Sequence, residues 1–352
     1  MNVSSVMKWG NQQRELFRNN GSISHLRNEL SLSSDKSSFL RLLSEDLELG
    51  NGQENVFNYF KNKNNQFIGG VFKCSYHPGL LFELANIEDI DATIDFDSIQ
   101  ETPIRTIKIK NGTEGIANPQ VVALFPENFL NHAVKDDDII FYFVDKFSKR
   151  HISYTRNVIE KFTVNHPFKE ILKDGEVELE QYVTNWVNLH EGAHRTGPLP
   201  IPKFLPEKSS SITAGIEELR VDLISMLYCL NKSSSKSDSY YKTFLLILAE
   251  RLLGYPFFRD IDKNFDAHSS CIFLDHLVND GLVSLKDAKI VFKENFNVGI
   301  KSLLQKIEKL ESDASKYNTL LERKTLLKSS ANQWLEEAHQ TIQFLKKLRG
   351  IL

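Results

Sequence analysis

The chain has 352 residues, of which 41% are apolar and 25% are charged, and its formal net charge is −3. This length allows two domains or one large core, and the composition is ordinary for a soluble globular protein. A charge so close to zero argues against a nucleic-acid surface and a membrane-binding patch, so we expect neither partner. The 3 cysteines are too few for a disulfide framework, and no stretch is apolar enough for a signal peptide or a transmembrane helix. We therefore expect a cytoplasmic protein with reduced, buried thiols.

The N-terminal part of the chain combines short helical segments with β-type segments. Residues 13–17 and 37–49 have the spacing of helices. Short β-branched and aromatic stretches, bounded by Gly, Pro or Asp and Asn, follow at 67–76, 91–99, 104–110, 121–125 and 138–147. We predict an N-terminal α/β region over residues 1–155 with four or five short strands.

The C-terminal part has the pattern of amphipathic helices. From about residue 155 onward, apolar residues recur three and four positions apart. Two long stretches of this kind cover residues 284–327 and 329–352. We predict a mostly helical region over 156–352 that carries the functional site. A helix-rich region after a smaller strand-containing region indicates the α+β class.

The stretch NWVNLHEGAH ends a helix that we predict over residues 174–194. His190 and His194 are four positions apart and lie on the apolar face of this helix. Neighbouring imidazoles on one face can bind one Zn²⁺ at about 2.0–2.1 Å. Glu191 follows the first histidine, where it can reach a metal-bound water and act as its base without binding the metal. The alternative is a chance HExxH pattern, with two histidines that need other buried partners.

A third ligand is available on the next predicted helix, residues 209–230. Glu218 and Asp222 are four positions apart beside the apolar stripe of this helix, so both can face the first helix. We predict that Glu218 completes the zinc site and that Asp222 accepts the outer N–H of a ligating histidine, which fixes its tautomer. Glu217 is expected to be solvated. The alternative for the pair is a solvated acidic face.

HExxH with a downstream glutamate resembles the gluzincin metallopeptidases. The segment EELRVDLISMLYCL (217–230) resembles the dipeptidyl peptidase III family, in which it begins Glu-Glu-Cys-Arg-Ala-Glu. VNLHEGAH (187–194) is similar to that family's V-G-L-H-E-L-L-G-H, and FDAHSSCIFLDHLVNDGLVSL (265–285) is similar to its Ala-His helix. The resemblance covers about residues 178–285. It implies a zincin-like catalytic region with one Zn²⁺ and a transition-state role for His268.

The chain departs from that family in three ways. Its zinc motif has the regular five-residue form, whereas the family has HExxxH. Ile272 stands where the family has an arginine, four positions after the transition-state histidine. The family's chains are much longer and have an upper lobe with a catalytic tyrosine, for which the N-terminal part here is too short. Release of dipeptides therefore does not follow from the resemblance.

Considered without the family, His268 lies in the first turn of a helix with Asp266 as its expected cap. A helix N-terminus disfavours the imidazolium, so a neutral N–H donor here could stabilise an oxyanion. The alternative is an ordinary surface or core histidine. Tyr154, Tyr240 and Tyr241 are unranked candidates for the tyrosine role.

Together these residues predict a zinc-dependent hydrolase that cleaves an amide or peptide bond in a short peptide or a small molecule. One Zn²⁺ per chain would be held by His190, His194 and Glu218, and Glu191 would activate the zinc-bound water. Two alternatives stay open. One is a zinc enzyme that acts on a non-peptide metabolite, and the other is a non-catalytic interaction protein stabilised by zinc.

Overall fold

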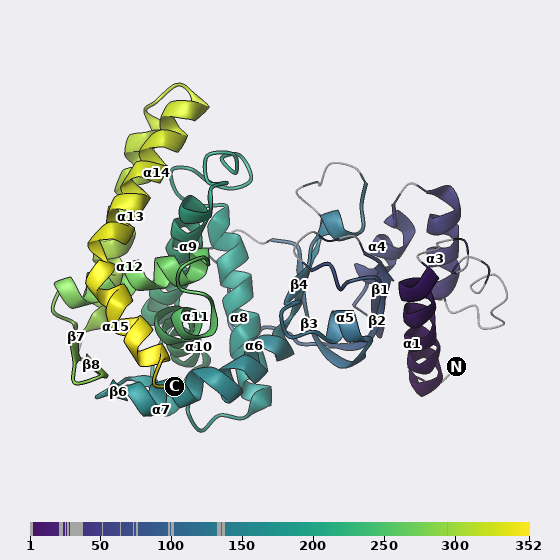
Figure 1. The fold of residues 1–352 in the computed structure, drawn as a ribbon, viewed down its shortest axis with the longest axis horizontal. Helices are drawn as coiled ribbons and strands as arrows, with labels where there is room; N and C mark the ends of the chain where they lie inside the picture. The colour runs from purple at the N-terminus through teal and green to yellow at the C-terminus, as the bar shows by residue number, and fades with distance from the viewer. Residues whose placement is uncertain are drawn as a thin grey trace. The chain divides into compact units, whose positions relative to one another are not determined.

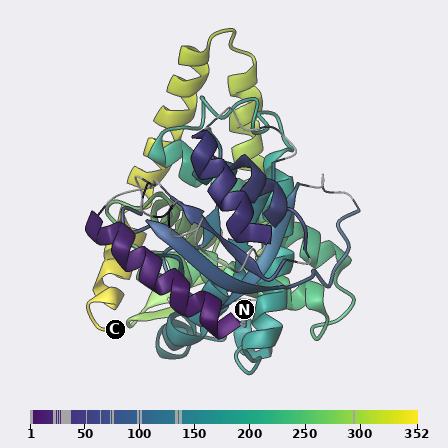
Figure 2. The same ribbon diagram turned by 90° about the vertical axis from the view of Figure 1, so that its right-hand side faces the viewer.

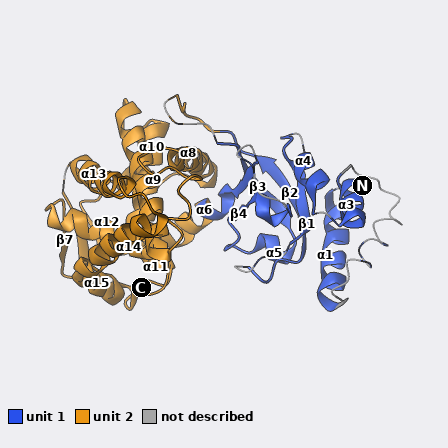
Figure 3. Cartoon of the chain, turned by 90° about the horizontal axis from the view of Figure 1, so that it is seen from above, with its two compact units in different colours: residues 1–91, 102–147 blue, residues 92–101, 148–352 orange. Residues whose placement is uncertain are grey.

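A computed structural model describes residues 3–20, 24, 26, 28, 38–50, 52–63, 65–72, 74, 77–97, 99, 102–131, 135, 138–293 and 295–352. The chain forms two compact units, one of residues 1–91 and 102–147 and the other of residues 92–101 and 148–352 (Figure 3). The first unit contains a five-stranded sheet, and the second is mostly helical. The α+β class predicted from the sequence is confirmed.

The first unit is built on a mixed sheet (Figure 1), and the strand order is β1-β2-β3-β5-β4. Neighbouring strands are antiparallel, except that β3 and β5 are parallel. The strands are β1 (Phe67–Val71), β2 (Phe82–Asp89), β3 (Ile104–Gly112), β4 (Ala123–Leu124) and β5 (Ile140–Phe143). The helices are α1 (Val3–Asn20), α3 (Ser38–Leu49), α4 (Glu54–Phe60) and α5 (Glu114–Ala117), with the 3-10 turn η1 (Pro126–Asn128). Helix α1 lies across the sheet (Figure 2), where Trp9 packs edge-on against Phe82.

The second unit is a group of helices around α9. Helix α6 (Val144–Arg150) leads into it from the first unit. The helices are α7 (Arg156–Phe162), α8 (Glu176–His194), α9 (Ser211–Lys232), α10 (Ser239–Ala249), α11 (Tyr255–Phe258), α12 (Phe265–Asn279), α13 (Phe296–Ser315), α14 (Leu320–Glu337) and α15 (His339–Arg349). The shorter turns are the π-helical η2 (His151–Thr155) and η4 (Glu250–Gly254) and the 3-10 turn η3 (Phe168–Glu170). Helix α9 packs against α8, α10, α12 and α13, so it is buried on several sides.

The strand predicted over residues 91–99 does not form in the described part of that segment. The Thr93 N–H instead donates to Asn185 Oδ1 of α8 at 2.9 Å, so a side chain and not a strand satisfies this backbone group. The sheet contains β2 in its place, which the sequence texture misses. Buried Glu83 and Asn86 interrupt the apolar pattern of β2, and that pattern is the main sequence signal for a strand.

A small second sheet, which the sequence pattern does not predict, interrupts the helices of the mostly helical region 156–352. Its strands are β6 (Thr163–Val164), β7 (Val283–Lys286) and β8 (Lys289–Phe292), in the order β6-β8-β7. Asp287 and Ala288 connect β7 and β8 with positive φ angles of 51° and 57°, as a two-residue hairpin turn requires. The helix predicted from residue 284 therefore begins only at Phe296, as α13.

The three cysteines are free thiols. Cys229 and Cys271 are buried, as expected, whereas Cys74 is only partly buried. Burial raises the pKa of the Cys271 thiol to about 12, so this thiol stays protonated and unreactive. None of the helices in the described residues is long and apolar enough to cross a membrane.

Candidate metal centre

Helix α8 places the two histidines of the HExxH stretch side by side. Glu178 caps the start of the helix by accepting the Gly175 N–H at 3.0 Å. The apolar residues at helical spacing, up to Trp186, are buried and fix the rotation of the helix about its axis. The rings of His190 and His194 meet edge-on, with 3.2 Å between their Nε2 atoms.

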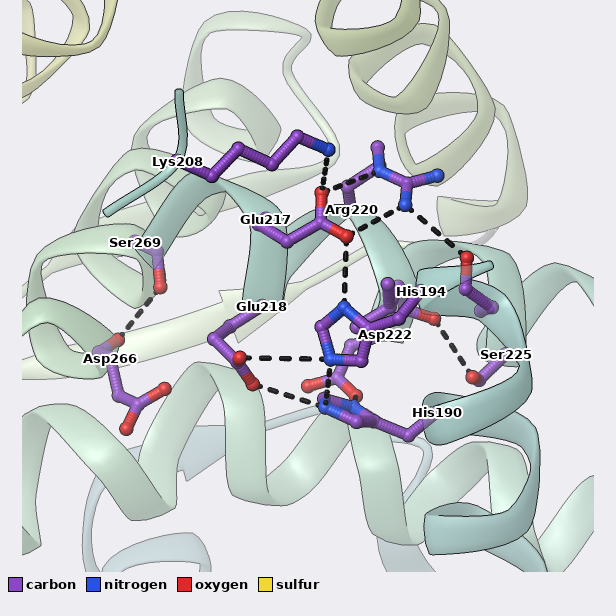
Figure 4. A network of polar contacts seen from close by, with 12 residues as sticks. His190, His194, Lys208, Glu217, Glu218, Arg220, Asp222, Ser225, Asp266 and Ser269 are labelled. Atoms are coloured by element: carbon purple, nitrogen blue, oxygen red, sulfur yellow. Dashed lines mark hydrogen bonds and ion pairs between the residues drawn. The ribbon is translucent and has the colours of Figure 1, made fainter. Parts of the chain in front are cut away.

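Helix α9 brings a carboxylate to the same point. Glu218 Oε2 lies 3.0 Å from His190 Nε2, and Glu218 Oε1 lies 3.7 Å from His194 Nε2 (Figure 4). The ligand atoms of a tetrahedral Zn²⁺, each about 2.0–2.1 Å from the metal, are about 3.3 Å from one another. The two nitrogens and the Glu218 carboxylate therefore have the spacing that one zinc ion needs.

A carboxylate holds the outer nitrogen of each imidazole. His190 Nδ1 lies 2.8 Å from Asp222 Oδ1, and His194 Nδ1 lies 2.9 Å from Glu217 Oε1 (Figure 4). Because an ionised carboxylate only accepts hydrogen bonds, both Nδ1 atoms carry a ring proton, and in the neutral imidazoles both Nε2 atoms present lone pairs. In this neutral form two lone pairs and the Glu218 carboxylate converge without a proton donor among them. Positive charge at this point, either a proton on His190 or a metal ion, stabilises the group.

Asp222 is itself fixed by two further buried side chains. Trp186 Nε1 donates to Asp222 Oδ1 at 2.7 Å, and Arg251 Nε donates to Asp222 Oδ2 at 2.7 Å. Arg251 belongs to the π-helical turn η4, a local distortion that is frequent at functional sites. We refer to His190, Asp222, Trp186 and Arg251 as the His190 arm. The predicted contact between Asp222 and an outer histidine nitrogen is present in this arm.

Glu217 occupies the corresponding place beside His194, and the prediction that it is solvated is wrong. Arg220 Nη2 donates to Glu217 Oε1 at 2.7 Å and Arg220 Nε donates to Oε2 at 2.8 Å, while Lys208 Nζ donates to Oε2 at 2.5 Å. The Glu217 side chain is 2% exposed. We refer to His194, Glu217, Arg220 and Lys208 as the His194 arm. An arginine three positions after Glu217 was the available sequence signal, but such pairs are equally common on exposed helix faces.

The electrostatics of the site favour a bound cation. Burial disfavours the imidazolium of His190, yet Asp222 and Glu218 outweigh it and hold the pKa of His190 well above its ordinary value. Burial also opposes ionisation of Asp222, but the charge of Arg251 and the bond to the histidine lower its pKa to about 2. The pKa of Glu217 lies well below its ordinary value because its cationic partners outweigh burial. The carboxylates thus stay charged at neutral pH and attract positive charge to the point between the rings.

Glu191 lies next to the same point. One of its carboxylate oxygens and the ring nitrogens of His190 and His194 lie within 4.8 Å of one another. The Glu218 carboxylate lies 3.0 and 3.7 Å from the two nitrogens and can supply the third ligand. Glu191 thus lies beside the candidate ligands.

The start of α12 differs from the prediction. Asn264 is the cap, because its side chain accepts the Ala267 N–H at 3.1 Å, so the expected cap Asp266 is wrong. Asp266 instead accepts a hydrogen bond from Arg251 Nη1 at 3.2 Å. A carboxylate that looks like a helix cap in the sequence thus extends the buried charge network of the His190 arm.

No described contact brings His268 to the two histidines. Asp266 and Ser269 both meet Arg251 Nη1, so they define the face of α12 that is turned to the site. His268 lies about 200° round the helix from Asp266, given about 100° per residue. Its imidazole is partly exposed and interacts electrostatically with Asp262. The transition-state role of His268 stays a prediction.

Two of the tyrosine candidates have partners elsewhere in the second unit. Tyr154 Oη donates to the carbonyl of Phe257 at 2.9 Å, and Tyr240 Oη accepts the Asp95 N–H at 3.1 Å. Ile272, which stands where the resembled family has an arginine, is buried in α12. The two tyrosine contacts stabilise the helices around the site. No described contact joins Tyr154, Tyr240 or Ile272 to the side chains of the candidate metal centre.

Comparison with known proteins bears on the fold. The sequence matches no protein-family model and no curated protein. Similar solved structures include those of DPP III from Caldithrix abyssi and dipeptidyl-peptidase III from Corallococcus sp. strain EGB, both with a TM-score of 0.59. The sequence identities are 15% and 13%, and the matches cover 92% and 93% of this chain and 68% and 66% of the other two. The chain therefore has a dipeptidyl peptidase III-like fold and spans about two thirds of the length of those proteins.

The fold match is wider than the sequence resemblance over residues 178–285. It covers 92% of the chain, and the remainder is far smaller than the first unit, residues 1–91 and 102–147. The N-terminal sheet therefore takes part in the shared fold, although its sequence shows no motif of that family.

Proposed function

We propose that this chain is a zinc-dependent hydrolase that cleaves an amide or peptide bond in a short peptide or a small molecule. The observation that carries this proposal is the convergence of His190 Nε2, His194 Nε2 and the Glu218 carboxylate within 3.0–3.7 Å. The dipeptidyl peptidase III-like fold supports a peptide bond as the substrate.

His190, His194 and Glu218 would hold the ion, while Asp222 and Glu217 would keep the imidazoles oriented. A bound zinc ion supplies a Lewis acid that polarises a carbonyl and lowers the pKa of a water molecule. The Glu218 side chain is 30% exposed and the two rings are 13% and 12% exposed. Structural zinc sites are closed, whereas catalytic sites leave one position open. This exposure favours a catalytic role over the non-catalytic alternative.

Glu191 would be the general base of the reaction. Its carboxylate would take a proton from the attacking water and deliver it to the leaving amine. The outer-nitrogen bonds of both arms would prevent the imidazoles from rotating while the proton moves. His268 is proposed as an N–H donor to the oxyanion on the resemblance, and His268→Asn tests that role by turnover at unchanged zinc content.

The first test is metal content. We expect about one zinc per purified chain by elemental analysis and a strong reduction in Glu218→Ala, because a three-ligand site loses one ligand. Glu336→Gln, which replaces an exposed carboxylate on α14, is the control and should keep its zinc. A zinc-free wild-type protein, or a Glu218→Ala variant that keeps its zinc, would reject the proposed site.

The second test separates catalysis from structure. Glu191→Gln should retain zinc and lose turnover by about 10²–10⁴-fold, the usual contribution of a general base. Unchanged turnover would eliminate Glu191 as the base. Screening the wild-type protein against short-peptide libraries and against metabolite extracts distinguishes a peptidase from an enzyme that acts on a non-peptide amide.

A further inference from the structure

A second group of charged side chains lies buried behind His194. Lys208 comes from the loop between α8 and α9, Glu217 and Arg220 from α9, and Glu311 from α13. Each of these four side chains is at most 4% exposed. Burying four charges is expensive, and an apolar cluster of the same volume would stabilise a fold at least as well. Such a cluster therefore points to a role other than stability.

The contacts form a chain that ends at the candidate metal ligand. Lys208 Nζ lies 2.7 Å from Glu311 Oε1 and 2.5 Å from Glu217 Oε2, so it bridges the two carboxylates. Arg220 Nε, which donates to Glu217, lies 3.5 Å from Glu311 Oε1. Glu217 Oε1 in turn holds His194 Nδ1 at 2.9 Å. Helix α13 thus reaches His194 through two cations and one carboxylate.

We propose that Glu311 is a positioning residue for His194 and that it acts by balancing the charge of Lys208 and Arg220. This inference rests on the proposed zinc site. Lys208 and Arg220 favour the ionised form of Glu311 against its burial, and with Glu311 ionised the group has two cations and two anions and is neutral. Without it, two cations share the single carboxylate of Glu217, which draws that carboxylate away from His194 and leaves a net positive charge behind the metal.

The charge balance predicts effects of opposite sign for two neighbouring residues. Glu311→Gln keeps the shape of the side chain but makes the group positive, which opposes a bound divalent cation. Lys208→Met removes a cation and leaves the group negative, with Glu217 free to accept more strongly from His194. A residue that only packs the helices together would give losses of the same sign in both variants.

The experiment measures the zinc affinity of the full chain by competition with a chelator in wild type, Glu311→Gln, Lys208→Met and the double variant. We expect Glu311→Gln to bind zinc about tenfold more weakly, at the lower end for residues that hold a ligand in place. Lys208→Met should bind as tightly as wild type or more tightly, and the double variant should return to within about threefold of wild type. Visible spectra of the Co²⁺-substituted proteins should keep one shape, because the ligands themselves do not change.

The outcomes are distinct. Unchanged affinity in Glu311→Gln, or weaker binding in both single variants with a further loss in the double variant, would overturn the positioning role while zinc binding by the wild type stands. A wild-type protein without zinc affinity would overturn the proposed function as well. If Glu311→Gln does not fold, the effect of removing the Glu311 charge is measured by comparing Lys208→Met with the double variant. The double variant must then bind zinc more weakly than Lys208→Met. Glu336→Gln is the control for removal of a carboxylate elsewhere in the C-terminal helices.

Discussion

The two histidines of the candidate metal centre are held by the same kind of contact from different parts of the chain. In the His190 arm, a carboxylate of α9 binds the ring and is itself bound by Arg251 from η4. In the His194 arm, the other carboxylate of α9 binds the ring and is bound by Arg220 from the same helix and by Lys208 from a loop. One arm thus depends on contacts among helices, and the other depends partly on the docking of a loop.

The two arms also differ in charge. Arg251 is shared by Asp222 and Asp266, so two carboxylates meet one guanidinium there, although burial raises the pKa of Asp266. Glu217 and Glu311 are balanced by two cations. The carboxylates of Asp222 and Asp266 outnumber the charge of Arg251 and favour a cation beside His190, whereas the His194 arm contributes mainly orientation. We expect the two arms to respond differently to equivalent substitutions.

The largest difference is expected when each arginine is replaced by methionine. Arg251→Met leaves Asp222 buried without its cation, and loss of one partner of a buried pair lowers the free energy of unfolding by about 3–5 kcal/mol. Arg220→Met should lower it by roughly half as much, because Lys208 still neutralises Glu217. Urea unfolding of the metal-free proteins measures both values. Equal losses would show that Lys208 does not compensate and that the arms are equivalent.

The pH dependence of stability tests Glu250, which precedes Arg251 of the His190 arm in η4. Glu250 Oε2 binds Arg150 at 3.0 Å and Oε1 binds His151 at 2.8 Å. Burial opposes its ionisation, but Arg150 and then His151 lower its pKa to about 2 from an ordinary value of 4.5. Because the folded-state pKa is the lower one, the stabilisation is fully present above pH 4.5 and is lost as the pH falls towards 2.

Glu250→Gln should therefore lower the free energy of unfolding at pH 7 by up to about 3 kcal/mol, at about 1.4 kcal/mol per pKa unit. The gap between wild type and variant should close between pH 4.5 and pH 2. Unfolding curves over this range measure it, and Glu160→Gln, an exposed carboxylate on α7, should show no such closure. A difference in unfolding free energy that is constant with pH would contradict the lowered pKa of Glu250.

The carboxylates that hold the two rings should have smaller but separable effects on zinc affinity. Asp222→Asn and Glu217→Gln should each weaken zinc binding by about 10–100-fold, because a side-chain amide can donate to Nδ1 and reverse the tautomer. Both substitutions remove one negative charge, but the loss should be larger for Asp222→Asn, because the charge of Asp222 is opposed by Arg251 alone whereas two cations oppose that of Glu217. Trp186→Phe, which removes a donor to Asp222 and leaves the charge of Asp222 unchanged, is the matched control. Equal affinities in the two carboxylate variants would remove the electrostatic difference between the arms.

Local sequence predicts the contacts of the two arms that arise within one helix turn, and misses those made by residues far apart in the chain. His190 and His194, and Glu218 and Asp222, are pairs at helical spacing, so the geometry of one helix turn brings each pair onto one face. Two such pairs on consecutive helices are enough to predict the contact between Asp222 and a histidine. Glu217 is different because its burial depends on partners that come from a loop and from α13, far along the chain.

Helix α9 also lacks the solvated face that the prediction for Glu217 assumes. A helix packed on several sides has no polar stripe to recognise, and its charged residues are then buried in pairs. The fold was predictable at the level of class for a related reason. Helical periodicity covers most of the second unit, whereas β2 and the β7–β8 hairpin depend on buried polar residues and a positive-φ turn that local periodicity does not show.

The smallest predicted effect concerns the loop that completes the His194 arm. Gly197 has φ +89°, and a Cβ on it would lie 2.7 Å from Arg220 Nη1, which the bonds to Glu217 hold in place. Gly281 also has a positive φ, of +68°, but a Cβ there would meet nothing within 4 Å. Both alanine variants should lose about 1–2 kcal/mol of unfolding free energy from backbone strain.

Only Gly197→Ala should also weaken zinc binding, by a few-fold, because only this methyl group displaces the guanidinium that orients Glu217 and, through it, the His194 ring. Zinc affinity measured beside thermal unfolding separates the two contributions, with Gly281→Ala as the strain-only reference. If both variants bind zinc as tightly as wild type, the seat of the loop on Arg220 has no influence on the metal. The His194 arm would then end at Glu217, and its dependence on the loop would be a matter of stability alone.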